Sequence, residues 1–214
     1  MSSRKLFEIG GVLTAVVLVA FGVAAIIIGS NGRSTVTDEL SQQKITGTPD
    51  MTPTNITAEV KQAGLDPAKT PIPSCSVAGK KIDNATDARC FAQYMNVHAL
   101  EATGGLVYSE MPRYATADGK GTNDPKAATQ VNGKPVDNPA RTIWINETAL
   151  STALNSSYMA DQTALFGIVV GIALLLAGLG FGILAIGGAL RNREGGGAPA
   201  AKAAEAPAAP AASA

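Results

Sequence analysis

The sequence contains few of the side chains that most often carry out chemistry in proteins. There are one histidine, two cysteines and one tryptophan in 214 residues, and aromatic residues make up 5% of the chain. The 17 basic and 17 acidic residues balance, so no overall charge favours binding to nucleic acid. A catalytic metal normally takes about three protein ligands, often with more than one histidine. These shortages argue against a nucleic-acid-binding protein and against a conventional metalloenzyme.

Charged residues are absent from two long stretches, at positions 9–32 and 162–190. Within them, residues 9–29 and 164–190 are almost entirely apolar or glycine. About 20 such residues are enough to cross a hydrocarbon core of roughly 30 Å. The sequence therefore predicts two transmembrane helices in the lipid bilayer.

The first apolar run has two possible interpretations, a signal peptide that is removed or an anchor that is retained. Arg4 and Lys5 precede the run, as they would in both cases. The run is longer than the apolar core of about 7–15 residues in a signal peptide, and no Ala-x-Ala site follows Ile28. We therefore expect an uncleaved signal anchor.

The charges beside the two runs predict the orientation in the plasma membrane. Basic residues precede the first run and follow the second, at Arg191 and Arg193, whereas Asp161 precedes the second. Positive residues stay in the cytoplasm, so both termini are expected there. The predicted segments are a cytoplasmic N-terminus (1–8), transmembrane helix 1 (9–29), an extracytoplasmic domain (30–163), transmembrane helix 2 (164–190) and a disordered Ala- and Pro-rich cytoplasmic tail (191–214).

The extracytoplasmic segment has start and stop signals for several helices. Thr52-Pro53 and Gly64 bracket a short helix at 54–63, and a longer one is expected from Asn84 to Gly104-Gly105. Further expectations are that residues 33–45 continue the first span, that 106–111 form a short strand, that 112–139 are loop, and that Asn138-Pro139 starts the helix leading into the second span. The expected fold is an all-α membrane protein with helical extensions of both spans and a small, mostly helical extracytoplasmic domain.

The only cysteines, Cys75 and Cys90, both fall in the extracytoplasmic segment. The outer face is oxidising enough to maintain a disulfide, and closing a loop of about 15 residues contributes on the order of 3 kcal/mol. Two free buried thiols are the alternative. The spacing does not match a zinc site. We expect the bridge to stabilise a thin core around four aromatic residues, Phe91, Tyr94, Tyr108 and Trp144.

Small residues form a stripe along each apolar run. In the second run they are Gly167, Gly171, Gly178 and Gly182, and in the first they include Gly11, Ala15 and Gly22. This spacing lets two helices approach closely, although glycine is also simply common in membrane helices. The stripes predict helix packing, either with the other span of the same chain or with a second subunit.

The single histidine, His98, is the most reactive candidate in the sequence. Glu101 lies three residues later on the same predicted helix, and Tyr94 lies one turn earlier. A facial iron site needs two histidines and a carboxylate, which this trio does not supply. No Gly-x-Ser-x-Gly elbow and no phosphate-binding glycine loop occurs either. The sequence predicts no catalytic residues, no metal site and no cofactor.

Three sequence blocks resemble a known group of proteins. They are CFAQYMNVHALEATGGLVYSEMPRY (90–114), TALNSSYMADQTALFGIVVGIALLLAGLGF (152–181) and GTPDMTP (47–53). With the spans, these blocks resemble a group of uncharacterised two-span actinobacterial membrane proteins. Some members carry an automatic label of aromatic ring-opening dioxygenase, whose iron ligands this chain does not contain. The resemblance implies a bacterial plasma membrane and brings no functional residues with it.

These observations favour a non-enzymatic integral membrane protein, an assembly or interaction component of the cell envelope. Its expected partners are the lipid bilayer and another membrane or envelope protein, or a second copy of the chain, with no nucleic acid. One alternative is an extracytoplasmic metal-binding sensor or enzyme that uses His98 and Glu101. Another is a small transporter or channel subunit, but the spans contain no ionisable residue and Thr14 is their main polar position.

Overall fold

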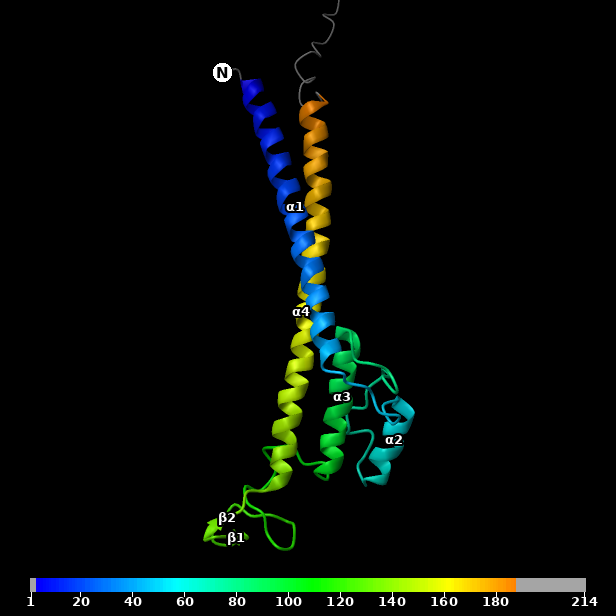
Figure 1. The fold of residues 1–214 in the computed structure, drawn as a ribbon, viewed down its shortest axis with the longest axis vertical. Helices are drawn as coiled ribbons and strands as arrows, with labels where there is room; N and C mark the ends of the chain where they lie inside the picture. The colour runs from blue at the N-terminus through cyan, green and yellow to red at the C-terminus, as the bar shows by residue number, and fades with distance from the viewer. Residues whose placement is uncertain (1–2, 188–214) are drawn as a thin grey trace, which may run out of the picture. The chain divides into compact units, whose positions relative to one another are not determined.

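The computed structural model describes residues 3–187. The predicted tail (191–214) and the last residues of the second predicted span (188–190) lie outside the described residues. The chain divides into two compact units (Figure 1). The small unit comprises Met1–Val23 and Ile172–Ala214, and the large unit is Ala24–Gly171.

The fold is mostly helical, as the sequence predicts. In order along the chain, the elements are α1 (Ser3–Gln42), α2 (Pro53–Gln62), α3 (Ala85–Ala102), β1 (Gln130–Val131), β2 (Lys134–Pro135) and α4 (Pro139–Ile186). The two long helices, α1 and α4, each contain one apolar run and continue without a break into the large unit. The predicted extensions of both apolar runs are therefore confirmed.

Three helices begin at the residues that the sequence indicates, because polar side chains cap their free backbone N–H groups. Thr52 Oγ1 accepts a 3.2 Å bond from the backbone of Asn55 at the start of α2. Asn84 Oδ1 accepts a 2.9 Å bond from the backbone N–H of Asp87 at the start of α3. Asn138 does the same for Ala140, with proline as the first residue of α4.

Within the large unit, α1 and α4 lie against each other in antiparallel directions. Gly29 is in such close contact that a Cβ added there would lie 2.6 Å from the carbonyl oxygen of Ala164. One turn further along α1, Arg33 Nε forms a 2.8 Å ion pair with Asp161 Oδ1. Asp161 is only 9% exposed, so this pair is the polar contact that fixes the register of the two helices.

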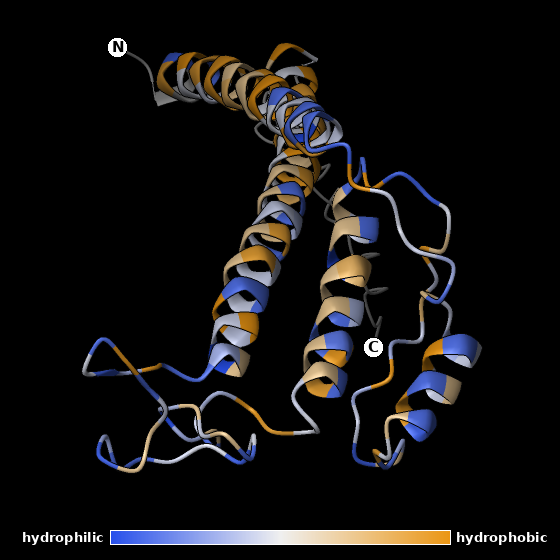
Figure 2. Ribbon diagram, turned by 60° about the horizontal axis from the view of Figure 1, so that its bottom comes forward, coloured by the Kyte–Doolittle hydropathy of each residue, from blue (hydrophilic) through white to orange (hydrophobic). Residues whose placement is uncertain are grey.

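The main core of the large unit joins both long helices to α2 and α3. Figures 1 and 2 both show α3 between α4 and α2. Leu40 of α1 and Leu154 of α4 are buried in the same cluster as residues from α2 and α3. The largest fully buried side chains of this cluster are Ile56, Val60, Val77, Ile82, Tyr94 and Val97. Each long helix thus contributes a side chain to the core.

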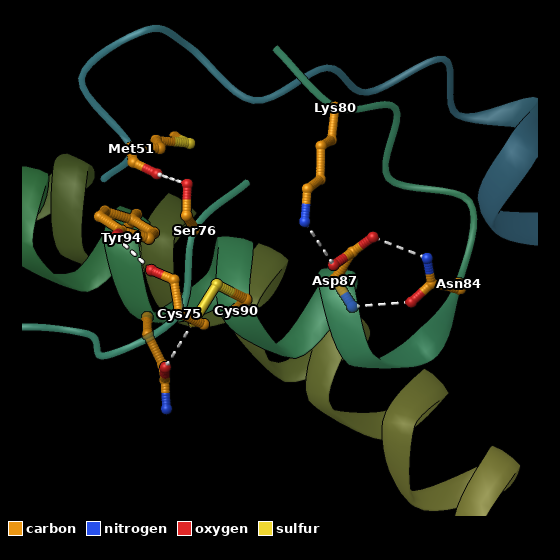
Figure 3. Close-up of a disulfide and its surroundings, with 9 residues drawn as sticks. Met51, Cys75, Ser76, Lys80, Asn84, Asp87, Cys90 and Tyr94 are labelled. Carbon is orange, nitrogen blue, oxygen red and sulfur yellow. Dashed lines mark hydrogen bonds and ion pairs between the residues drawn. A yellow bond between two sulfur atoms is a disulfide. The ribbon is translucent and has the colours of Figure 1, made fainter. Parts of the chain in front are cut away.

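The disulfide between Cys75 and Cys90 is present and joins the segment before α3 to the helix itself (Figure 3). Beside it, the hydroxyl of Tyr94 donates a 2.6 Å hydrogen bond to the carbonyl oxygen of Cys75. Ser76 donates to the carbonyl oxygen of Met51. The predicted bridge is therefore confirmed, and it holds the 75–76 segment against both α3 and the connection that leads into α2.

The expected single aromatic core is wrong in two respects, because Tyr108 and Trp144 lie outside the main core. Tyr108 is 43% exposed. The guanidinium of Arg141 covers its ring at 4.1 Å from the centroid. Trp144 belongs to a second, smaller cluster with Ala99 and Met111. Tyr94 and Phe91 contribute to the main core as predicted.

The segment 106–111 is not the short strand that the sequence predicts. It forms turns, because the carbonyl oxygen of Leu106 accepts hydrogen bonds from the Trp144 indole, at 2.8 Å, and from the Thr103 hydroxyl, at 2.7 Å. The predicted loop at 112–139 instead contains a small hairpin of β1 and β2. Asn132 and Gly133 form its turn with positive φ angles of 52° and 75°. This Asn-Gly pair was the sequence signal for the hairpin.

The small unit consists, in its described part, of the ends of α1 and α4 packed through small residues. A Cβ added at Gly178 would lie 2.8 Å from Val19 Cγ2 and 3.0 Å from the carbonyl oxygen of Ala15. A Cβ at Gly11 would lie 3.1 Å from that of Ala185, and one at Gly182 would lie 3.7 Å from that of Ala15. Gly11, Gly178 and Gly182 therefore contact the other long helix of the same chain, and the role of the stripes in contact with a second subunit stays a prediction. Gly22 and Gly171 are buried, and Gly167 is partly buried.

Both long helices are long and apolar enough to cross a membrane. Only 11% of the most apolar window of α1 and 17% of that of α4 are buried. Large side chains such as Phe21, Phe166 and Ile183 are exposed instead. A helix in the core of a soluble protein would bury most of such a face.

Breaking the disulfide is expected to destabilise the large unit. A Cys75→Ser/Cys90→Ser variant should unfold with a free energy lower by about 3 kcal/mol, because the reduced unfolded chain regains the entropy of a 15-residue loop. Thermal unfolding in detergent, followed by circular dichroism with and without reductant, measures this. If oxidised wild-type protein and the variant unfold alike, the bridge contributes nothing to stability.

Enlarging Gly178 is expected to separate the two helices of the small unit. Gly178→Leu should destabilise their association by on the order of 1–3 kcal/mol, because the side chain meets backbone atoms of α1. Gly180→Leu is the matched control, since a Cβ there meets nothing within 4 Å. Thermal unfolding of the two variants in detergent compares their stabilities. Equal effects of the two substitutions would contradict the packing.

Candidate functional site

The large unit contains a cavity of about 1200 Å³ between the ends of α1 and α4, α3, and the connection from α1 to α2. Its apolar lining residues, which we call its apolar wall, are Leu40, Met51, Phe91, Met95, Leu150 and Leu154. Titratable groups also line it: Glu39, Asp50, Glu59, His98 and Glu101. This combination of an apolar wall with a few grouped polar side chains is typical of ligand sites.

Asp50 reaches the cavity because the chain after α1 is fixed by hydrogen bonds to a second segment. The backbone N–H of Gly47 donates to Lys80, that of Ile82 donates to Ile45, and that of Val77 donates to Met51. Gly47 packs directly against the carbonyl group of Val77, where there is no room for a side chain. Residues 45–51 are therefore held in place immediately before the cap of α2.

His98 and Glu59 come from the two helices of the same core. His98 lies one turn after the buried Tyr94 on α3. Glu59 lies on α2, next to the buried Val60 and three residues after the buried Ile56. Candidate ligand atoms of Asp50, Glu59 and His98 all lie within 4.8 Å of one another. The fold thus brings a loop residue and two helical residues, from distant parts of the sequence, to one point.

Three polar atoms at this point are shielded from solvent and short of partners. His98 Nε2 lies 2.9 Å from Asp50 Oδ2, which is ion-pair distance, and neither atom has a partner beyond the other. Glu101 Oε1, about one turn further along α3, is shielded from solvent and has no hydrogen-bond partner. Polar atoms shielded from solvent are costly when they lack partners, so this isolated pair and the carboxylate beside it point to a ligand.

The carboxylates around the cavity differ in their affinity for protons. Burial raises the pKa of Glu101 above its ordinary value, and the negative charges of Glu59 and Asp50 raise it further, while His98 acts in the opposite direction. Burial also works against the ionisation of Asp50. Hydrogen bonds from Thr48 and the backbone, together with the charge of His98, outweigh it and lower the pKa of Asp50.

The sequence-based candidates are only partly brought together. His98 and Glu101 line the same cavity, as their shared helix face indicates. Tyr94 does not join them, because its hydroxyl bonds to the backbone of Cys75. Burial, followed by the charge of Asp50, raises the pKa of the Tyr94 hydroxyl. Sequence reasoning missed Asp50 and Glu59, which lie 48 and 39 residues before His98 (98 − 50 and 98 − 59).

A second acidic segment, at 118–124, is a set of turns within the predicted loop at 112–139. Asp118 Oδ1 accepts hydrogen bonds from the Thr116 hydroxyl and the backbone of Lys120. Asp124 Oδ1 accepts one from the backbone of Lys126. These carboxylates cap turns of the loop.

Comparison of the chain with protein-family models, with curated proteins and with solved structures finds no match. The function must therefore be argued from the site itself.

Replacing Glu101 by glutamine is expected to stabilise the protein at neutral pH. A carboxyl whose pKa is raised by folding stabilises the protein fully only below its unfolded value, ordinarily 4.5, and loses this contribution as the pH rises through the folded value. Glu101→Gln should therefore melt above the wild type at pH 7, and the difference should vanish toward pH 4.5.

The measurement is thermal unfolding against pH in a buffer that contains a chelator. Asp38→Asn, an exposed position on α1, is the control for a change of one acidic residue. A Glu101→Gln variant that is less stable than the wild type at pH 7 would show that the ionised carboxylate is well satisfied.

Proposed function

We propose that the protein is a non-enzymatic, two-span integral membrane protein that binds another component of the cell envelope through its large unit. The exposed apolar faces of α1 and α4 support placement in a bilayer, because lipid is the solvent in which such faces are stable. The basic flanks of the spans favour cytoplasmic termini in the plasma membrane. The disulfide agrees with an oxidising compartment for the large unit.

The cavity is the observation that carries the binding role. Its apolar wall suits a partner with apolar surface, and its grouped polar atoms provide orientation. The partner is another membrane or envelope protein, or a second copy of this chain. Leu150, which is 52% exposed, lies on this wall and is available to it.

A non-enzymatic role fits the side chains of the cavity. Ser157 is its one serine, and its hydroxyl donates to the carbonyl oxygen of Ala153 within α4. Both cysteines are bonded to each other. Neither the serine nor the cysteines therefore provide an activated nucleophile.

A photo-reactive amino acid at position 150 tests this role in the membranes of cells that make the protein. We expect light to produce one defined adduct of constant mass, because one partner occupies the cavity. The matched control is Val131 in β1, which is 56% exposed and does not line the cavity.

An adduct with the mass of two chains would identify the partner as a second copy. No adduct at position 150, or the same set of adducts at 150 and 131, would contradict a binding role for the cavity.

A further inference from the structure

The cluster of Asp50, Glu59 and His98 has the composition of a metal site. It offers two carboxylate oxygens and one imidazole nitrogen from three separate segments, and these atoms lie within 4.8 Å of one another. Three protein ligands with a free fourth position are the usual number in an open zinc site. The sequence alone predicts no metal here, because the two carboxylates lie far from His98 along the chain.

The geometry is close to that required for coordination. Oxygen and nitrogen ligands bind zinc at about 2.0–2.2 Å, so two of them around a tetrahedral ion lie about 3.4 Å apart. The atoms of Asp50 and His98 are about 0.5 Å closer than that, at 2.9 Å. The remaining separations are up to 4.8 Å, so side-chain movements on the order of 1–1.5 Å complete the set.

An ordinary ion pair explains the cluster less well than a metal does. In such a pair the imidazole N–H donates to the carboxylate, but Nε2 and Oδ2 are both shielded from solvent with no partner beyond each other, and the carboxylate of Glu59 lies within 4.8 Å of them. A cation placed between them would satisfy both atoms at once. It would also offset the negative charges of Asp50 and Glu59, which otherwise lie close together.

We propose that Asp50, Glu59 and His98 bind one divalent transition-metal ion of the zinc class, with a free coordination position toward the cavity. The imidazole nitrogen favours such an ion over calcium and magnesium, which prefer oxygen ligands. Among these metals, zinc binds more tightly than manganese or ferrous iron to sites of this kind. Glu101 lines the same cavity with an unpaired Oε1, and it would accept a hydrogen bond from a metal-bound water there.

The test is zinc binding by the purified full-length protein in mild detergent, after removal of metal with a chelator. Titration against a coloured competing chelator gives the stoichiometry and the affinity. We expect one zinc ion per chain, and affinity weaker by more than about 100-fold in both His98→Ala and Glu59→Gln. Asp38→Asn, on an exposed position of α1 away from the cavity, should bind as the wild type does.

Circular dichroism and an intact disulfide confirm that each variant is folded. Glu59→Gln keeps the test valid if His98→Ala does not fold, because Glu59 is only partly buried on α2. Wild-type protein that binds no zinc at 100-fold molar excess overturns the proposal, and so does stoichiometric binding that both variants retain. The result is independent of the cross-linking experiment, because it concerns the purified chain without a partner.

Discussion

The close antiparallel contact between α1 and α4 is the constraint on which the large unit depends. Glycine at position 29 allows the backbones to approach, and the pair of Arg33 and Asp161 fixes how far one helix is shifted along the other. Because both helices continue past this contact, Leu40 and Leu154 reach the same core as α2 and α3. The helical extensions of the two apolar runs are thus structural parts of the large unit. A change in the register of α1 against α4 would disturb the packing of its core.

The candidate site follows from the same arrangement. The ends of the two long helices form one wall of the cavity, while His98 and its carboxylate neighbours come from the part that the disulfide and Tyr94 hold together. Polar atoms without partners are left where these two parts meet. Stable packing elsewhere in the core is what allows an unfavourable cluster of this kind to persist, and such clusters often mark binding sites.

Local signals in the sequence predict the helices well, because capping at Thr52, Asn84 and Asn138 acts within three residues. The disulfide is predictable because there are only two cysteines. The candidate site is not predictable from the sequence. Asp50 lies beside His98 only because backbone hydrogen bonds join segments that are distant in the chain, and such pairing leaves no periodic pattern in the sequence. The false strand at 106–111 has the same origin: its apolar residues suggest a strand, but Trp144 from α4 holds the segment in turns.

The position of residues 30–163 on the outer face of the membrane is the central claim, because the disulfide and the proposed envelope partner both depend on that compartment. A single cysteine introduced at the exposed Val131 tests it most directly, since the two native cysteines are bonded to each other. In intact cells, a maleimide that does not cross membranes should label this variant as fully as it does after permeabilisation. Labelling that occurs only after permeabilisation would place the large unit in the cytoplasm and contradict the account.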